Sequence, residues 1–273
     1  MRRVYLIPNM ITAFGLACGL FVIFKVNMVE PGSGLFQVLR ISVLLLLVAA
    51  FADLLDGAVA RAFRAESEFG FIFDSLADAI SFGVAPSVLL LKTLSLEPGT
   101  GLSFLAVLGA MLYSICGILR LVRFNVKTTE PNAEALSEKK HFTGLPIPAA
   151  ALAAVSLNFL FASNFFHNYF SLSEEAHAIT LSIVMIILGY FMVSRWKFPS
   201  SKALHFRVPS FQLVFGTVIS AIFIFYGTLY FFPIMLTIVT WSYILLGWTL
   251  SIIRLIAGRK SKTLVDFEPE HED

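Results

Sequence analysis

Four aspartates stand at regular spacing in the middle of strongly apolar sequence. Asp53 and Asp56 are three residues apart. Asp74 and Asp78 are four residues apart. Residues at these spacings share one face of a helix, so each pair presents two carboxylates side by side. Because a carboxylate at bilayer depth costs about 2.5–3.5 kcal/mol, the cluster needs a compensating partner. Carboxylate oxygens suit Mg²⁺ or Mn²⁺, and we therefore predict a divalent-cation site.

The number of carboxylates indicates which reaction such a site would support. If the two helices are antiparallel neighbours, the two pairs face each other and surround one pocket. Four carboxylates are more than one ion needs, so we predict two ions. Paired metals about 3.5–4 Å apart are the usual device for displacement at phosphorus. A divalent-cation transporter would also place acids in a membrane, but its sites lie near the midplane between broken helices.

Small and basic residues next to the aspartates also fit a phosphate-containing ligand. Gly57 and Gly70 each lie near a carboxylate, where the absence of a side chain lets a ligand approach the backbone. Arg61 follows Asp56 by five residues and offers a bidentate donor to phosphate. The run from Gly57 to Ala60 also fits an ordinary helix-packing face, and that alternative stays open.

The composition assigns the whole chain to the membrane. Of its 273 residues, 58% are hydrophobic and 14% are charged, and the mean hydropathy is +0.83. An ordinary soluble domain carries about 25% charged residues. The two cysteines, Cys18 and Cys116, both lie in apolar segments and indicate neither a disulfide framework nor a metal site. We expect membrane lipids around this protein and no nucleic-acid partner.

The apolar segments predict an all-α, multi-pass transmembrane helical bundle of about eight spans. A span needs about 20 mostly apolar residues. Eight segments qualify, at about 8–27, 36–60, 70–92, 102–121, 146–166, 177–194, 210–230 and 233–256. We expect one integral-membrane domain over residues 1–262. The acidic tail over residues 263–273 is expected to be disordered.

The distribution of positive charge predicts the orientation. With these spans, only Lys25, Arg40 and Lys92 fall on one side of the membrane, which leaves seventeen of the twenty lysines and arginines on the other. Such an excess marks the cytoplasmic side. We therefore expect both termini in the cytoplasm, in a cytoplasmic or inner membrane. The same topology places all four aspartates close to the cytoplasmic face.

The residues around the aspartates resemble the motif of the CDP-alcohol phosphatidyltransferase family. The matching pattern is Asp53-x2-Asp56-Gly57-x2-Ala60-Arg61-x8-Gly70-x3-Asp74-x3-Asp78, with every position present. The resemblance implies transfer of a phosphatidyl group from a CDP-linked lipid to an alcohol, with release of CMP. It implies that Asp53, Asp56 and Asp74 bind the metals, and that Asp78 contacts metal and acts as the base. Gly57, Ala60, Arg61 and Gly70 would then contact the CDP diphosphate.

Further segments are similar to the subclass of this family that uses L-serine as the acceptor. They are Ser81–Pro86, Leu119–Asn125, Phe142–Ala150, Phe191–Ser194 and Phe198–Lys202. This similarity runs from Pro8 to about Lys202. It implies that CDP-diacylglycerol and L-serine are converted to phosphatidylserine and CMP by a homodimer. Glycerol 3-phosphate or an inositol phosphate as acceptor, and an archaeal-type lipid as donor, stay open as alternatives.

Two polar residues begin the first span. Asn9 and Thr12 are three residues apart after Pro8. The resemblance implies that they contact the nucleotide or its diphosphate. The same two residues also fit an N-cap that begins a helix after a turn.

Polar residues at the ends of later spans are candidates for binding the acceptor or a phosphate. Arg120 and Arg123 are three apart at a cytoplasmic helix end, with Asn125 beside them. They would clamp a phosphate or the serine carboxylate, although positive-inside anchoring explains the arginines as well. Ser81 lies one turn after Asp78 and would face the acceptor or pack against a neighbouring helix. We expect Lys139, Lys140 and His141 to be loop residues exposed to solvent or lipid.

Overall fold

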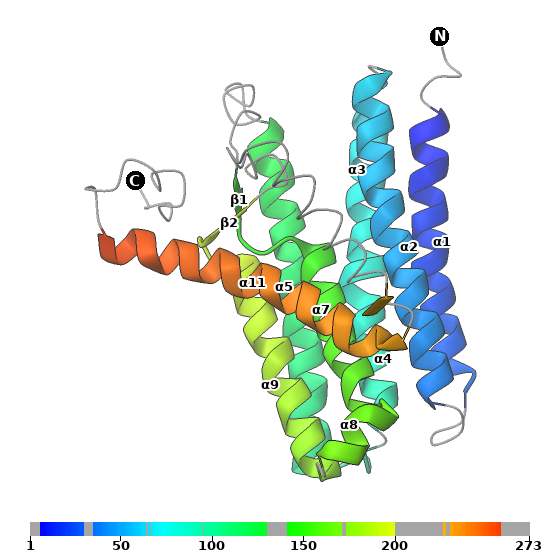
Figure 1. The fold of residues 1–273 in the computed structure, drawn as a ribbon. Helices are drawn as coiled ribbons and strands as arrows, with labels where there is room; N and C mark the ends of the chain where they lie inside the picture. The colour runs from blue at the N-terminus through cyan, green and yellow to red at the C-terminus, as the bar shows by residue number, and fades with distance from the viewer. Residues whose placement is uncertain are drawn as a thin grey trace.

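The computed structural model describes residues 6–29, 35–63, 65, 67–94, 96–129, 141–170, 173–199, 226–227 and 230–257. Helices dominate these residues, which confirms the predicted all-helical membrane bundle (Figure 1). Within them, six helices are long and apolar enough to cross a membrane. They are α1 (Leu6–Asn27), α2 (Leu35–Ala62), the continuous segment Glu68–Thr93, α5 (Gly101–Thr129), α9 (Glu174–Val193) and α11 (Phe232–Ala257).

Several of the helix ends that the charge count assigns to one side lie together at one end of the bundle. In Figure 1 the start of α1, the end of α2, the start of α3 (Glu68–Asp78) and the end of α5 are all at the top. The end of α1, the start of α2 and the short helix α8 (Asn164–Tyr169) lie at the opposite end. Helix α11 runs across the bundle and packs on α7 (Ile147–Phe161).

The fifth expected span is shorter than the sequence suggested. Helix α7 has 15 residues and a length of about 22 Å, whereas the hydrocarbon core is about 30 Å thick. It stops because Ser163 caps a separate helix, its hydroxyl accepting a bond from the Phe166 N–H at 3.3 Å. The expected helix over 146–166 is therefore two helices, α7 and α8, with a turn at Ala162 and Ser163.

Several predictions fall outside the described residues. They include nearly all of the expected seventh span, the tail over 263–273, and Lys139 and Lys140. The side chain of His141 also lies outside the described part. The number of spans, about eight, stays a prediction for this reason.

The third span is one continuous helical segment with a change of pitch in the middle. It consists of α3 (Glu68–Asp78), a π-helical turn η1 (Ala79–Val84) and α4 (Ala85–Thr93). Ser67 begins α3 as an N-cap, because its hydroxyl accepts a hydrogen bond from the Gly70 N–H at 3.0 Å. The turn η1 begins directly after Asp78, so the last of the four aspartates lies at the junction of the two helix types.

Helix α1 lies against both aspartate-bearing helices because small residues let the backbones approach. A Cβ at Gly15 would lie 3.4 Å from the Cβ of Ala52 in α2. A Cβ at Gly19 would overlap Ser81 of η1. Lipid offers no hydrophobic drive for helices to associate, so such close small-residue contacts supply much of the packing energy. The spacing Gly15-x3-Gly19 is the sequence signal for this face.

A short ribbon joins two segments that lie far apart in the sequence. Strand β1 (His141–Thr143) pairs antiparallel with β2 (Lys197–Pro199), with Phe142 opposite Phe198. Gly144 follows β1 with φ +79°, and its N–H donates to the Trp196 carbonyl at 2.8 Å. A side chain at Gly144 would overlap the carbonyl oxygen of Met192, so this turn requires glycine. Two segments that resemble the serine-using subclass are thus hydrogen-bonded to each other.

Candidate active site

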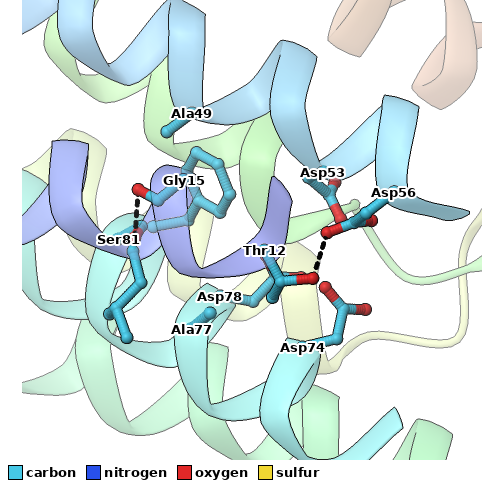
Figure 2. A pocket seen from close by; sticks show the side chains of 11 residues that line it. Thr12, Gly15, Ala49, Asp53, Asp56, Asp74, Ala77, Asp78 and Ser81 are labelled. Atoms are coloured by element: carbon cyan, nitrogen blue, oxygen red, sulfur yellow. Dashed lines mark hydrogen bonds between the residues drawn. The ribbon is translucent and has the colours of Figure 1, made fainter. Parts of the chain in front are cut away.

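Three of the four aspartates converge from two helices. Asp53 and Asp56 come from α2, and Asp74 comes from α3. One carboxylate oxygen from each lies within 4.8 Å of the other two. Figure 2 shows these side chains pointing toward one another across the gap between the two helices. The prediction that the two pairs face each other is therefore confirmed for Asp53, Asp56 and Asp74.

Asp78 lies one turn further along the third span and lines the same pocket. Its charge is close enough to Asp53, Asp74 and Asp56 for repulsion among the carboxylates. The pocket is bounded by residues of α1, α2, α3 and η1 (Figure 2). Its lining residues are Thr12, Gly15, Leu16, Ala49, Asp53, Asp56, Asp74, Ala77, Asp78, Ser81 and Phe82.

Thr12 is tied directly to the aspartate cluster. Its hydroxyl lies 2.5 Å from Oδ2 of Asp56, and 3.1 Å from the Pro8 carbonyl one turn back in α1. Both side chains are buried, with Thr12 6% and Asp56 5% exposed. The hydroxyl has one proton to donate, and the shorter distance indicates that it donates to the Asp56 carboxylate. Thr12 therefore holds Asp56 in one orientation, a role that the sequence alone did not indicate.

Asn9 lies over the start of α3. A Cβ at Gly70 would be 2.9 Å from Oδ1 of Asn9 and 3.0 Å from Oγ of Ser67. The absence of a side chain at Gly70 thus leaves room for the Asn9 amide beside the first turn of α3. Asn9 and Gly70, which are far apart in the sequence, come together at the same end of the site.

Residues of the last turns of α2 lie beside the pocket rather than in its wall. Arg61 is exposed, and a Cβ at Gly57 would lie 3.4 Å from its Nη1. The guanidinium therefore lies over Gly57, one turn from Asp56. Ala60 is half-buried in the same turn.

Arg120 brings a positive charge from α5 toward the aspartates. Its charge is close enough to Asp78 and Asp53 to attract both carboxylates. Its Nε is buried and has no hydrogen-bond partner among the described residues. A buried donor without a partner is costly, so this group is available to a ligand that brings an acceptor.

The other candidates on α5 hold neighbouring helices together. Nη1 of Arg123 donates to the Val193 carbonyl at the end of α9, at 3.3 Å. Oδ1 of Asn125 accepts a hydrogen bond from the Ser75 hydroxyl at 3.1 Å. Ser75 is adjacent to Asp74, so Asn125 fixes the end of α5 against the aspartate-bearing helix. Sequence reasoning missed Ser75, because nothing in its local pattern separates it from an ordinary helical serine.

Ser81 is almost fully buried, at 2% exposed. Its hydroxyl lies 3.4 Å from the Gly15 carbonyl, and its backbone is in the close approach to Gly19. Ser81 also lines the pocket. Ser81 therefore packs against α1, as one of the two sequence interpretations expected. It also lies in the wall of the aspartate pocket, as the other interpretation requires.

The donor set of the cluster fits a hard divalent cation. Asp53, Asp56 and Asp74 offer only carboxylate oxygens, and such ligands are typical of magnesium and manganese sites. Three ionised carboxylates this close together repel one another, and a cation among them would offset that repulsion. The chemistry of the residues present therefore matches a metal centre at this position.

Comparison with known proteins agrees with this geometry. Residues 5–193 match the family model described as CDP-alcohol phosphatidyltransferase. The chain is 35% identical over 196 residues to the CDP-diacylglycerol–serine O-phosphatidyltransferase of Bacillus subtilis, covering 72% of this chain and 91% of that protein. It is 32% identical over 214 residues to the Helicobacter pylori (strain 26695) protein of the same name, covering 78% and 80%.

An archaeal relative bears a different name. The chain is 36% identical over 169 residues to the archaetidylserine synthase of Methanothermobacter thermautotrophicus. That match covers 59% of this chain and 64% of the archaeal protein.

Proposed function

Since this chain belongs to the CDP-alcohol phosphatidyltransferase family, we propose that it transfers the phosphatidyl group of CDP-diacylglycerol to the hydroxyl of L-serine, which yields phosphatidylserine and CMP. The observation that carries this proposal is the convergence of Asp53, Asp56 and Asp74, with Asp78 lining the same pocket. The names of the bacterial relatives support serine as the acceptor.

The three converging carboxylates would hold the divalent metal, Mg²⁺ or Mn²⁺, which we propose to be two ions. When bound, such ions stabilise negative charge on the attacking and leaving oxygens of a displacement at phosphorus. Asp56 is held for this role by Thr12, and Asp74 lies beside Ser75, which is anchored to α5. Asp78 as a further metal ligand stays a prediction.

Asp78 is the residue we propose as the general base. It lines the pocket but is not one of the three carboxylates that lie within 4.8 Å of one another. It would take the proton from the serine hydroxyl as the serine oxygen bonds to the lipid-side phosphorus. The bond from that phosphorus to the bridging oxygen breaks, and CMP departs with the electron pair. A base must reach the proton it removes, and only a group inside the pocket can do so.

Polar groups on α1 and α2 near the aspartates would bind the nucleotide. Asn9 and Gly70 lie together at the start of α3, and Arg61 lies exposed over Gly57. Because Gly57 and Gly70 have no side chains, the Arg61 guanidinium and the Asn9 amide can lie over their backbone, where both would reach the diphosphate. Ala60 lies on the same turn as Gly57. Arg61 would add a bidentate donor to a phosphate oxygen.

Arg120 is the group we propose for the serine carboxylate. Its buried Nε lacks a partner among the described residues, and its charge lies near Asp78. A carboxylate bound there would bring the serine hydroxyl toward the base. Two further candidates would support Arg120 by holding α5 to its neighbours, namely Arg123 and Asn125. Ser81 would contact the acceptor from the wall of the pocket.

We further propose that the protein works as a homodimer with its active site at the cytoplasmic face of a cytoplasmic or inner membrane. The charge asymmetry of the sequence supports this orientation. The ends of α2 and α5, near which Arg61 and Arg123 lie, are at the same end of the bundle as the start of α1 (Figure 1). CDP-diacylglycerol would enter from the lipid with its acyl chains still in the membrane, and serine would enter from water.

The test is an assay of purified protein with CDP-diacylglycerol, Mg²⁺ or Mn²⁺, and labelled serine. We expect labelled phosphatidylserine and an equal amount of CMP. Matched reactions replace serine by glycerol 3-phosphate or an inositol phosphate, and replace the donor by its archaeal ether analogue. CMP release that depends on another acceptor would refute serine, and metal uptake into proteoliposomes without CMP release would support a transporter instead.

A further inference from the structure

The turn η1 determines which way the aspartate-bearing part of the third span faces. The Ala85 N–H bonds to the carbonyl of Ile80, five residues back instead of four. A π turn adds one residue, and one residue corresponds to about 100° of rotation in an α-helix. If η1 became α-helical, Asp78 would rotate relative to α4 and the helices packed on it. The direction of Asp78 therefore depends on keeping this turn.

Pro86 supplies no backbone donor to the carbonyl groups of the turn. It has no N–H, so it cannot bond to Phe82 four residues back or to Ser81 five residues back. A carbonyl inside a membrane protein that lacks a hydrogen-bond donor is costly. Tyr113 of α5 supplies a side-chain donor here, because its hydroxyl bonds to the Phe82 carbonyl at 2.9 Å. Tyr113 is 0% exposed and Phe82 is 1% exposed.

A second bond from α5 reinforces the first. The Ser114 hydroxyl donates to the Gly83 carbonyl at 2.9 Å. It also lies 2.9 Å from the Ser87 hydroxyl, which donates in turn to the Ala110 carbonyl at 3.1 Å. Two successive residues of α5 thus bind two successive carbonyls of η1.

The opposite side of η1 is held by α1. Ser81 lies against Gly15 and Gly19 of α1, so η1 is clamped between α1 and α5. Ser81 and Phe82 also line the aspartate pocket, whereas Tyr113 lies outside that lining. Tyr113 is therefore linked to the pocket through the turn and does not line the pocket itself.

We propose that Tyr113 is a positioning residue for the transfer reaction. By binding the Phe82 carbonyl, it keeps the π turn that directs Asp78 into the pocket. This inference rests on the proposed function, since it assigns Asp78 a part in the chemistry. A purely structural role would affect stability alone, so the test must separate stability from turnover.

The experiment compares three variants of the full-length protein with the wild type, measuring CMP release and thermal unfolding in detergent. Tyr113→Phe removes only the hydroxyl. Tyr113→Phe combined with Pro86→Ala restores a backbone N–H that bonds to Phe82 in the ordinary α-helical pattern. The control is Ser182→Ala in α9, which removes another fully buried hydroxyl, bonded to the Ala178 carbonyl at 2.7 Å.

We expect Tyr113→Phe to lower kcat about tenfold or more, because small misplacements of a catalytic group are costly. The KM values for serine and CDP-diacylglycerol should stay within about twofold. The double variant should regain thermal stability and keep the low kcat. Ser182→Ala should keep a normal kcat.

A kcat near the wild-type value in Tyr113→Phe would overturn the inference, and so would recovery of kcat together with stability in the double variant. If Tyr113→Phe alone does not fold, the double variant decides in the same way. The wild type is measured first with each acceptor. Activity with a different acceptor would refute serine as substrate, and the comparison of variants would then use that acceptor.

Discussion

The bond from Thr12 to Asp56 provides the sharpest test of the metal site. Thr12→Val replaces the hydroxyl with a methyl group of similar size and keeps the β-branched shape. The substitution removes the 2.5 Å contact to Asp56 and leaves the helix otherwise unchanged. Asp56 would then be free to turn away from Asp53 and Asp74, so we expect weaker metal binding.

The size of the effect follows from the burial of this bond. A hydrogen bond to a charged group contributes about 1.5–3 kcal/mol, and the burial of both partners places this bond within that range. At about 1.4 kcal/mol per factor of ten, this corresponds to a loss of about 10–150-fold in affinity. Removal of a residue that orients a metal ligand typically costs about 10–100-fold. We therefore expect the half-saturating Mg²⁺ concentration to rise about 10–100-fold.

The assay measures CMP release as a function of Mg²⁺ concentration, together with direct Mn²⁺ binding to the purified protein by electron paramagnetic resonance. Turnover at saturating metal should change much less than the metal affinity. Thr12→Ser keeps the hydroxyl and is the matched control, with nearly normal affinity expected. Mn²⁺ binding by Thr12→Val that is as tight as in the wild type would refute the reasoning.

Three further predictions address the base, the helix packing and the acceptor. Asp78→Asn should lower turnover by about 10²–10⁴-fold while nucleotide binding persists, and near-normal turnover would remove the assignment of the base. In Gly19→Ala the new Cβ would lie 2.7 Å from Cα of Ser81, so α1 and η1 must separate at a cost of about 1–3 kcal/mol. The midpoint of thermal unfolding in detergent should fall, and an unchanged midpoint would contradict the close contact. Arg120→Gln should raise the KM for serine about tenfold, since a bond to a charged group is lost. If the arginine serves only as a membrane anchor, insertion will change and the KM will not.

The sequence was sufficient to predict a membrane-embedded helical bundle and to identify the aspartates as a candidate site. Helical spacing places Asp53 with Asp56, and Asp74 with Asp78, on shared faces. This follows from backbone geometry within one helix and requires no knowledge of the neighbours. The helices that correspond to most expected spans are present for the same reason, because apolar length is a local property. The break after α7 escaped prediction, since an N-cap at Ser163 outweighed the apolar composition around it.

Only the tertiary structure decided what surrounds the aspartates. Thr12 and Asp56 are 44 residues apart, and Phe142 lies opposite Phe198 in the ribbon. Tyr113 binds a carbonyl 31 residues away in η1. These contacts depend on which helices pack closely against each other. A small residue such as Gly19 permits close packing, but the sequence does not show which segment will lie against it. Local spacing determined which residues share a helix face, whereas packing between distant segments decided which partners hold those faces in place.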